Sequence, residues 1–314
     1  MTNTAVVPTP VVTALGDGRA GVMPFGPSTV DVETDGLAVP GKATVGRVAA
    51  AGIDGMQAAD VDRSEKFAMM RAGDLGSVHS WELVTSVDGP GTRMTIFLSG
   101  CPLRCLFCHN PDTMAMKNGE AVTSEELLKR ISRYRTIFQT TGGGITLSGG
   151  EVLMQPAFAA NILRGAKKMG IHTTIDTSGF LGAACTDEML DDIDLVLLDV
   201  KAGDEETYKK VTGRSLAPTL KFGQRLADNG TEMWIRFVLV PGLTDSFENV
   251  ELIADHVAKW STVSRVEVLP FHQMGKDKWA DLGMKYELAD TEPPTKAEVE
   301  RVREQFRARG LEVY

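Results

Sequence analysis

The chain has 314 residues, a formal net charge of −9 and a hydrophobic fraction of 43%, which is the balance of an ordinary globular protein. Its length suits two domains or one α/β barrel. The acidic balance argues against binding to nucleic acid, and the absence of a long apolar run or an apolar leader argues against a membrane span and secretion, so we expect a cytoplasmic protein.

The N-terminal part differs in composition from the rest. Residues 1–73 sustain no helical or strand period, and Gly and Pro interrupt the stretch up to Pro40. We expect a low-complexity, mostly disordered extension with one short helix near 60–71. An alternative is that translation begins at Met69 or Met70. The folded part is expected to span 74–314.

From Ser77 onward, apolar β-branched runs alternate with helical patterns. Thr123 and Glu126 have the spacing of a capping box, which predicts a helix start ahead of Leu127. The helical pattern at 157–169 ends at Gly170. Strands are predicted at 94–98, 145–147, 173–175, 195–198, 234–240 and 266–269, and further helices at 157–169, 186–191, 205–211, 219–229, 247–259 and 296–309. This alternation indicates βα units and a parallel sheet, and about six such units fit a partial barrel better than two domains.

Three of the four cysteines are close together. Cys101, Cys105 and Cys108 have the spacing C-x3-C-x2-C and directly follow a predicted strand, at the end where barrel enzymes place their chemistry. Three thiolates can hold three irons of a four-iron, four-sulfur cubane and leave the fourth iron open. The alternative is a structural zinc site with His109 as fourth ligand. Because His109 directly follows Cys108, a single tetrahedral centre that includes both would be sterically awkward.

This spacing, with Phe107 before the last cysteine, resembles the radical S-adenosylmethionine superfamily. More segments of that pattern follow in order, namely DGPGTR (88–93), CLFCHNP (105–111), GGG (142–144), SGGE (148–151), HTTIDT (172–177), LDVK (198–201), WIR (234–236) and LPFH (269–272). Together they resemble the glycyl-radical-enzyme activating family, over about 76–314. The resemblance implies a partial (β/α)6 TIM-like barrel of the radical SAM type.

The resemblance also implies the cofactors and the reaction. A [4Fe-4S] cluster on the three cysteines would bind S-adenosylmethionine and cleave it reductively, and the resulting 5′-deoxyadenosyl radical would take a hydrogen atom from a glycine of a partner protein. The chain lacks the cysteine-rich insertion of several related activases, so the expected partner is pyruvate formate-lyase, with flavodoxin or ferredoxin as reductant. The alternatives are an activase of anaerobic ribonucleotide reductase and a non-catalytic iron–sulfur electron carrier.

Two strand-end segments are expected to bind the S-adenosylmethionine. Glycines allow close backbone approach, and Glu151 adds a negative charge near an ammonium group. Alternation puts Asp199 and Lys201 on one face of the strand and Val200 on the other. The alternative for Asp199 and Lys201 is a purely structural ion pair. By resemblance, the methionyl amine is bound by Ser148, Gly149, Gly150 and Glu151, the ribose and carboxylate are contacted by Asp199, Val200 and Lys201, and Lys201 also meets the peptide substrate.

The resemblance assigns the remaining candidates. Phe107, Cys108 and His109 are expected to pack around the cofactor, His272 to lie near its adenosyl group and Arg236 near its carboxylate. Asp88 is expected to help hold the target loop. A monovalent cation is expected at Asp176, Thr177 and Asp199. Cys185 has no assigned role.

Overall fold

The computed structural model describes residues 48–49, 52–85 and 87–314. Its strands are β1 (Val48–Ala49), β2 (Leu75–Thr85), β3 (Thr92–Leu98), β4 (Glu120–Thr123), β5 (Gly144–Gly149), β6 (His172–Thr177), β7 (Leu195–Asp199), β8 (Glu232–Leu239) and β9 (Val263–Pro270). Its α-helices are α1 (Arg63–Ala72), α2 (Ser124–Ser132), α3 (Arg135–Thr141), α4 (Pro156–Lys168), α5 (Asp187–Leu190), α6 (Glu205–Thr212), α7 (Ala217–Asn229), α8 (Phe247–Val257), α9 (Lys276–Asp281) and α10 (Lys296–Arg307).

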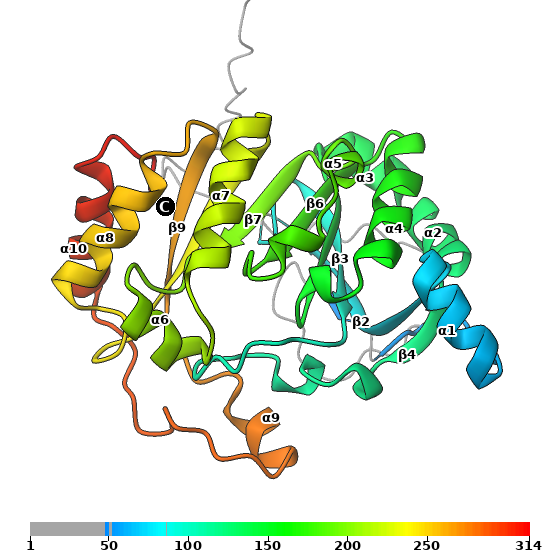
Figure 1. Ribbon diagram of the computed structural model, residues 1–314, viewed down its shortest axis with the longest axis horizontal. Helices are drawn as coiled ribbons and strands as arrows, with labels where there is room; N and C mark the ends of the chain where they lie inside the picture. The colour runs from blue at the N-terminus through cyan, green and yellow to red at the C-terminus, as the bar shows by residue number, and fades with distance from the viewer. Residues whose placement is uncertain (1–47, 50–51, 86) are drawn as a thin grey trace, which may run out of the picture. The chain divides into compact units, whose positions relative to one another are not determined.

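The strands form one sheet in the order β1-β2-β3-β5-β6-β7-β8-β9, with β4 paired to β2. All pairs from β3 to β9 are parallel, whereas β2 is antiparallel to β3. The six predicted strands are therefore confirmed as the parallel part of the sheet, and β2 and β4 are additions to it. Helices flank the sheet, and the carboxyl ends of β7 and β9 lead toward α6 and α9 (Figure 1).

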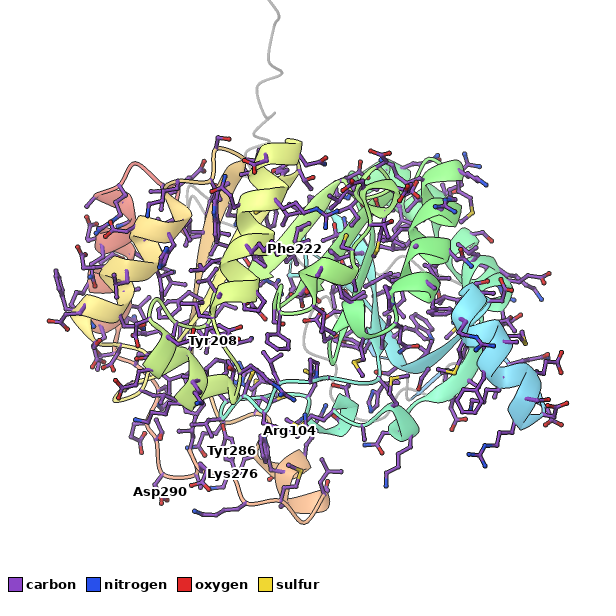
Figure 2. The ribbon with its side chains drawn as sticks, in the orientation of Figure 1. Arg104, Tyr208, Phe222, Lys276, Tyr286 and Asp290 are labelled. Atoms are coloured by element: carbon purple, nitrogen blue, oxygen red, sulfur yellow. The ribbon has the colours of Figure 1, made fainter. Side chains whose placement is uncertain are left out.

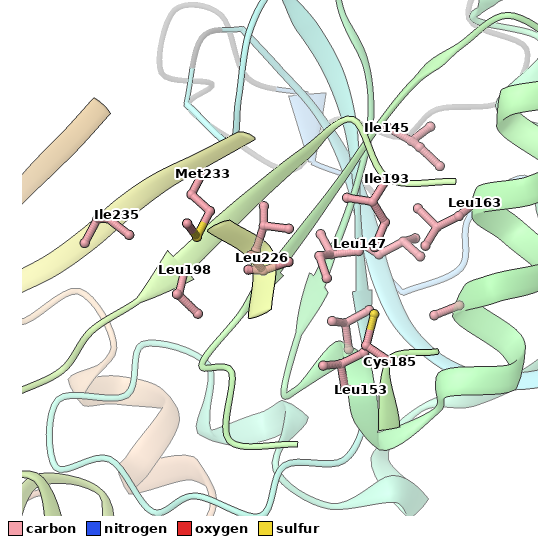
Figure 3. Close-up of a cluster of buried hydrophobic side chains, with 14 of the residues drawn as sticks. Ile145, Leu147, Leu153, Leu163, Cys185, Ile193, Leu198, Leu226, Met233 and Ile235 are labelled. Carbon is pink, nitrogen blue, oxygen red and sulfur yellow. The ribbon is translucent and has the colours of Figure 1, made fainter. Parts of the chain in front are cut away.

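The main core lies between the parallel strands and these helices. Ile145 and Leu147 on β5 and Leu198 on β7 are fully buried, as are Leu163 on α4 and Leu226 on α7 (Figure 3). Strands buried on both faces read as continuous apolar runs, which is why the sequence predicted them.

Cys185 belongs to this same core. It follows the short 3-10 helix η4 (Gly182–Ala184), its side chain is buried, and burial raises the pKa of its thiol to about 11 (Figure 3). A buried thiol of raised pKa is unreactive and packs as a small apolar side chain.

The predicted helix ends are largely confirmed. Gly170 follows α4 with a left-handed φ of 70°. Thr123 caps α2 by accepting a hydrogen bond from the Glu126 N–H at 3.2 Å. The reciprocal pair of a full capping box is found at Thr295 and Glu298, ahead of α10.

The expected short helix near 60–71 is α1, which begins after its cap Asp62. Residues 52–72 contact the rest of the fold: Met56 is buried in the main core, the Trp81 indole donates to the Asp54 carbonyl at 2.9 Å, and Asn161 donates to the Ala72 carbonyl at 3.2 Å. The division at residue 73 stays a prediction, and most of the extension it describes, residues 1–47, lies outside the described residues. No helix in the described part of the chain is long and apolar enough to cross a membrane.

Candidate active site

A cavity of about 210 Å³ lies at the carboxyl ends of the parallel strands. The structure brings most of the predicted site residues to its wall, which includes Cys101, Cys105, Phe107, Cys108, His109, Ser148, Gly149, Gly150, Asp176, Thr177, Asp199, Lys201 and Arg236. Four predicted residues are not part of this wall, namely Asp88, Glu151, Val200 and His272. A larger cavity of about 650 Å³ between η4 and α7 is lined by none of the predicted residues. The chemistry-bearing side chains therefore identify the smaller cavity as the site.

Backbone hydrogen bonds fix the cysteine loop. The Cys101 N–H donates to the Met114 carbonyl at 3.0 Å, and the Leu106 N–H donates to the Val211 carbonyl, just inside the end of α6, at 3.0 Å. Burial raises the pKa of Cys101 and of Cys108 to about 12 and also raises the pKa of Cys105. The thiols are therefore neutral without metal, and metal binding must displace their protons.

The three cysteine thiols and His109 line one cavity. A tetrahedral Cys3His zinc centre would need all four side chains around a single ion. A polynuclear iron–sulfur cluster places each thiolate on a different iron, which suits three thiols on the wall of one cavity.

The two glycines after β5 are needed for close backbone packing. Gly149 has a φ of 113°, and a Cβ there would lie 2.2 Å from the Leu98 carbonyl oxygen. A Cβ on Gly150 would lie 2.4 Å from the Gly100 carbonyl oxygen. The Gly150 N–H donates to the Leu98 carbonyl at 2.8 Å, and the Glu151 N–H donates to the Gly100 carbonyl at 2.9 Å. This turn is thus joined to the start of the cysteine loop.

The Glu151 side chain has a different surrounding from the one that the sequence suggested. Its carboxylate is buried and accepts hydrogen bonds from the Thr177 hydroxyl at 2.6 Å, from the Leu153 N–H at 3.1 Å, and from the Ser178 N–H and hydroxyl at 3.0 and 2.5 Å. Four donors occupy both oxygens. Glu151 therefore joins the end of β5 to the end of β6, instead of facing the cavity.

Arg236 on β8 is surrounded by carboxylates. Its guanidinium lies 3.2 Å from Asp88, 3.5 Å from Asp176 and 3.1 Å from Glu267, and its side chain is 10% exposed. Burial raises the pKa of Asp176 to about 7, while Arg236 opposes that rise and Asp199 adds to it. Of these three carboxylates only Asp176 lines the cavity together with Arg236, and Glu267 is also paired with Arg265 at 3.0 Å.

Lys201 supplies a second cation. Its ammonium lies 2.8 Å from Asp199, which confirms that the two side chains share a face, and 5.5 Å from the centre of the Phe107 ring. Burial alone would lower the pKa of Lys201, but Asp199 and Cys105 raise it above its ordinary value. The ammonium in turn lowers the pKa of all three cysteines and so favours their thiolates. Val200 between them is buried in the main core.

The Asp88 loop is held by a fully buried arginine. Arg93 donates to the Pro90 carbonyl at 3.2 Å, to the Thr146 hydroxyl at 2.7 Å and to the Thr174 hydroxyl at 2.8 Å. Thr146 in turn donates to the Asp88 carbonyl at 2.6 Å. The loop is thereby anchored to β5 and β6, and the Asp88 carboxylate is directed to Arg236.

The two predicted histidines meet at the rim. The rings of His109 and His272 stack with centroids 4.1 Å apart, and the His109 ring contacts the His272 carbonyl at 3.2 Å. His109 lines the cavity, so His272 reaches it through this stack.

Comparison with known proteins decides between the interpretations of this site. The sequence model of the Radical SAM superfamily matches residues 95–253, half of the chain. The pyruvate formate-lyase-activating enzyme of Clostridium pasteurianum is 45% identical over 218 residues, which are 69% of this chain and 91% of that protein. The pyruvate formate-lyase 1-activating enzyme of Escherichia coli (strain K12) is 40% identical over 231 residues, 73% and 94% of the two chains.

The chain belongs to the pyruvate formate-lyase-activating enzymes of the radical SAM superfamily. Members of this family use a [4Fe-4S] cluster and S-adenosylmethionine. Among solved structures, a radical SAM methyltransferase from Sphaerobacter thermophilus shares the fold, with a TM-score of 0.54 and 16% identity over 82% of this chain and 76% of that one.

Sequence reasoning missed several residues of this family member's site. Asn110 and Ser178 line the cavity beside the predicted residues, and Glu267 pairs with Arg236. Glu267 could have been found, because it lies opposite Arg236 in the register of β8 and β9. Trp279 donates to the Cys108 carbonyl at 2.9 Å.

Proposed function

We propose that this chain activates pyruvate formate-lyase by generating a glycyl radical on it. When bound, the cluster supplies the electron that cleaves S-adenosylmethionine to methionine and a 5′-deoxyadenosyl radical, which takes the α-hydrogen of the glycine. The observation that carries the proposal is the convergence of Cys101, Cys105 and Cys108 with Asp199 and Lys201 on one cavity, in a chain that covers over nine-tenths of its activating relatives.

The cysteine loop and the turn after β5 would together hold the cofactors. The three thiolates would bind iron, and Lys201 would favour their deprotonated state. The backbone of Ser148–Gly150 would form hydrogen bonds with the methionyl group. The buried Glu151 carboxylate holds the adjacent end of β6 in place through Thr177 and Ser178. Asp199 would accept from the ribose, and the His109–His272 stack would border the adenosyl group.

Asp176, Thr177 and Asp199 would hold a monovalent cation. Oxygen donors suit such an ion, and these three residues line the same cavity. The Ser148 hydroxyl already donates to Asp176 at 2.7 Å, so the cation would share that carboxylate.

The partner's glycine loop would approach near Asp88. Arg93 anchors the Asp88 loop and Arg236 fixes its carboxylate, so the carboxylate is pre-positioned to accept hydrogen bonds from a peptide. We also propose flavodoxin or ferredoxin as the electron donor and a cytoplasmic location, where reducing conditions keep the thiols available for iron.

The test is cleavage of S-adenosylmethionine by the anaerobically reconstituted, reduced protein. We expect methionine and 5′-deoxyadenosine, with more product when pyruvate formate-lyase is added. Product formation that pyruvate formate-lyase leaves unchanged, but that another glycyl-radical enzyme stimulates, would identify a different partner. A loaded and reduced protein that forms neither product would be an electron carrier.

A further inference from the structure

A buried tyrosine hydroxyl lies behind the cysteine loop. Tyr286 is 8% exposed, and among the described residues its hydroxyl oxygen is buried without a hydrogen-bond partner. Leaving a buried hydroxyl unpaired is unfavourable, because the group has lost its hydrogen bonds to water. Native proteins pair nearly all such groups with protein, water or a ligand. The Tyr286 hydroxyl therefore calls for an acceptor that the polypeptide alone does not supply.

The neighbours of Tyr286 place it against the cysteines. Its ring packs on Trp279 with centroids 5.5 Å apart, and the Trp279 indole donates to the Cys108 carbonyl at 2.9 Å. Tyr286 and Trp279 share one apolar cluster with Cys105 and Phe107, and Cys108 packs against that cluster. Figure 2 labels Tyr286 and Arg104, one residue from each of these two segments.

Electrostatics agrees with this placement. Burial and the Cys108 thiolate both raise the pKa of Tyr286, so the phenol keeps its proton at neutral pH and stays a donor. A negatively charged cysteine sulfur is a favourable acceptor for such a buried hydroxyl, because hydrogen bonds to charged acceptors are stronger than those to neutral ones.

The segment that carries Tyr286 is held on the cysteine loop at several points. The Gln273 amide donates to the carbonyls of Leu288, Ala289 and Thr291 at 3.2, 2.9 and 2.9 Å and so closes the segment on itself. The Lys278 ammonium donates to the Asn110 side chain at 3.0 Å. Together with the bond from Trp279 to Cys108, these hydrogen bonds hold the segment that carries Tyr286 beside the cysteine loop.

We propose that the Tyr286 hydroxyl donates a hydrogen bond to the Cys108 thiolate when that thiolate binds iron, and thereby raises the reduction potential of the cluster. Hydrogen bonds to cluster sulfurs are among the factors that set this potential, because a donor stabilises the more negative, reduced state. The inference rests on the proposed function only in needing the cluster. Tyr286 tunes that cluster and contacts neither S-adenosylmethionine nor the partner in this role.

The test compares Tyr286→Phe with the unchanged protein, both loaded with iron and sulfide, in a redox titration followed by EPR without S-adenosylmethionine or partner. We expect a more negative midpoint. A tenfold lower ratio of reduced to oxidised cluster at a fixed potential corresponds to 59 mV for one electron. The iron–cysteine stretching bands in resonance Raman spectra should shift as well. Tyr134→Phe is the matched control, because Tyr134 packs on Trp81 and Phe138, against the main core and not in the cluster that holds Tyr286.

An unchanged midpoint and unchanged Raman bands in fully loaded Tyr286→Phe would overturn the inference. If that variant fails to hold iron, a fluorinated tyrosine at position 286 keeps the ring and makes its hydroxyl a stronger donor. The midpoint should then move to a less negative value, and no movement would overturn the inference. An unchanged protein that takes up no cluster at all would overturn the proposed function itself.

Discussion

Replacing Arg236 by methionine should destabilise the protein strongly. The arginine is the shared partner of Asp88, Asp176 and Glu267, whose side chains are all largely buried. Methionine fills a similar volume but leaves Asp88 and Asp176 without their cation, whereas Glu267 keeps its ion pair with Arg265 at 3.0 Å. Removing one partner of a buried ion pair costs about 3–5 kcal/mol, mainly because the remaining charge stays buried and uncompensated. We therefore expect a loss of about 3–5 kcal/mol in the free energy of unfolding at pH 8.

The loss should depend on pH in a defined direction. The folded-state pKa of Asp176 is raised to about 7 from an ordinary value of 3.8, so its contribution to stability is greatest below pH 3.8 and is lost as pH rises through 7. Arg236 lowers this pKa, so its removal raises it further. At pH 5.5 a protonated Asp176 no longer needs the cation. Arg236→Met should therefore cost less stability at pH 5.5 than at pH 8.

Urea unfolding followed by circular dichroism at the two pH values measures both effects. The control is Arg307→Met, which removes an arginine that is 38% exposed and paired with Glu300 and Glu304 on the surface of α10. Exposed pairs contribute about 0–1 kcal/mol. If Arg236→Met cost no more than Arg307→Met, or cost more at pH 5.5 than at pH 8, the reasoning about the buried carboxylates would be refuted.

Three further changes test other parts of the site and fold. Cys105→Ala should abolish both the brown absorbance of the cluster and S-adenosylmethionine cleavage. The control Cys185→Ala, at a core thiol outside the site, should keep both. Persistent cleavage by Cys105→Ala would show that Cys105 is not a cluster ligand. Lys201→Met should keep its iron but lower cleavage on the order of tenfold, and an unchanged rate would exclude Lys201 from the site. A chain that starts at Met69 lacks the Asp62 cap and the buried Met56, so urea unfolding should show a loss of about 2–5 kcal/mol in the free energy of unfolding. Equal stability would show that α1 and the residues before it do not stabilise the fold.

The sequence predicted the parallel sheet well because its strands are short and buried on both faces. In β7, Leu195, Val196, Leu197 and Leu198 are all buried, and the run reads as a strand without any context. The longer β2 was not predicted. It pairs with β3 on one side and β4 on the other, and its sequence mixes polar and apolar residues without a clear period. Pairing with neighbours, not local pattern, defines that strand.

The site was predictable wherever strand ends carry the chemistry, because parallel strands bring their carboxyl ends to one edge. Cys108, Asp176 and Lys201 meet on one cavity wall for this reason. The orientation of Glu151 was not predictable, since it depends on donors that the next strand supplies. Tyr286 gave no local signal either, because its importance arises only where a distant segment packs on the cysteine loop.

The most direct test of the central claim is an EPR spectrum of pyruvate formate-lyase after anaerobic incubation with this reduced, cluster-loaded protein and S-adenosylmethionine. The account predicts a glycyl-radical doublet on pyruvate formate-lyase, formed together with 5′-deoxyadenosine. It also predicts no doublet when Cys105→Ala replaces the unchanged protein. The absence of the doublet, from a protein whose cluster is intact and reduced, would contradict the account.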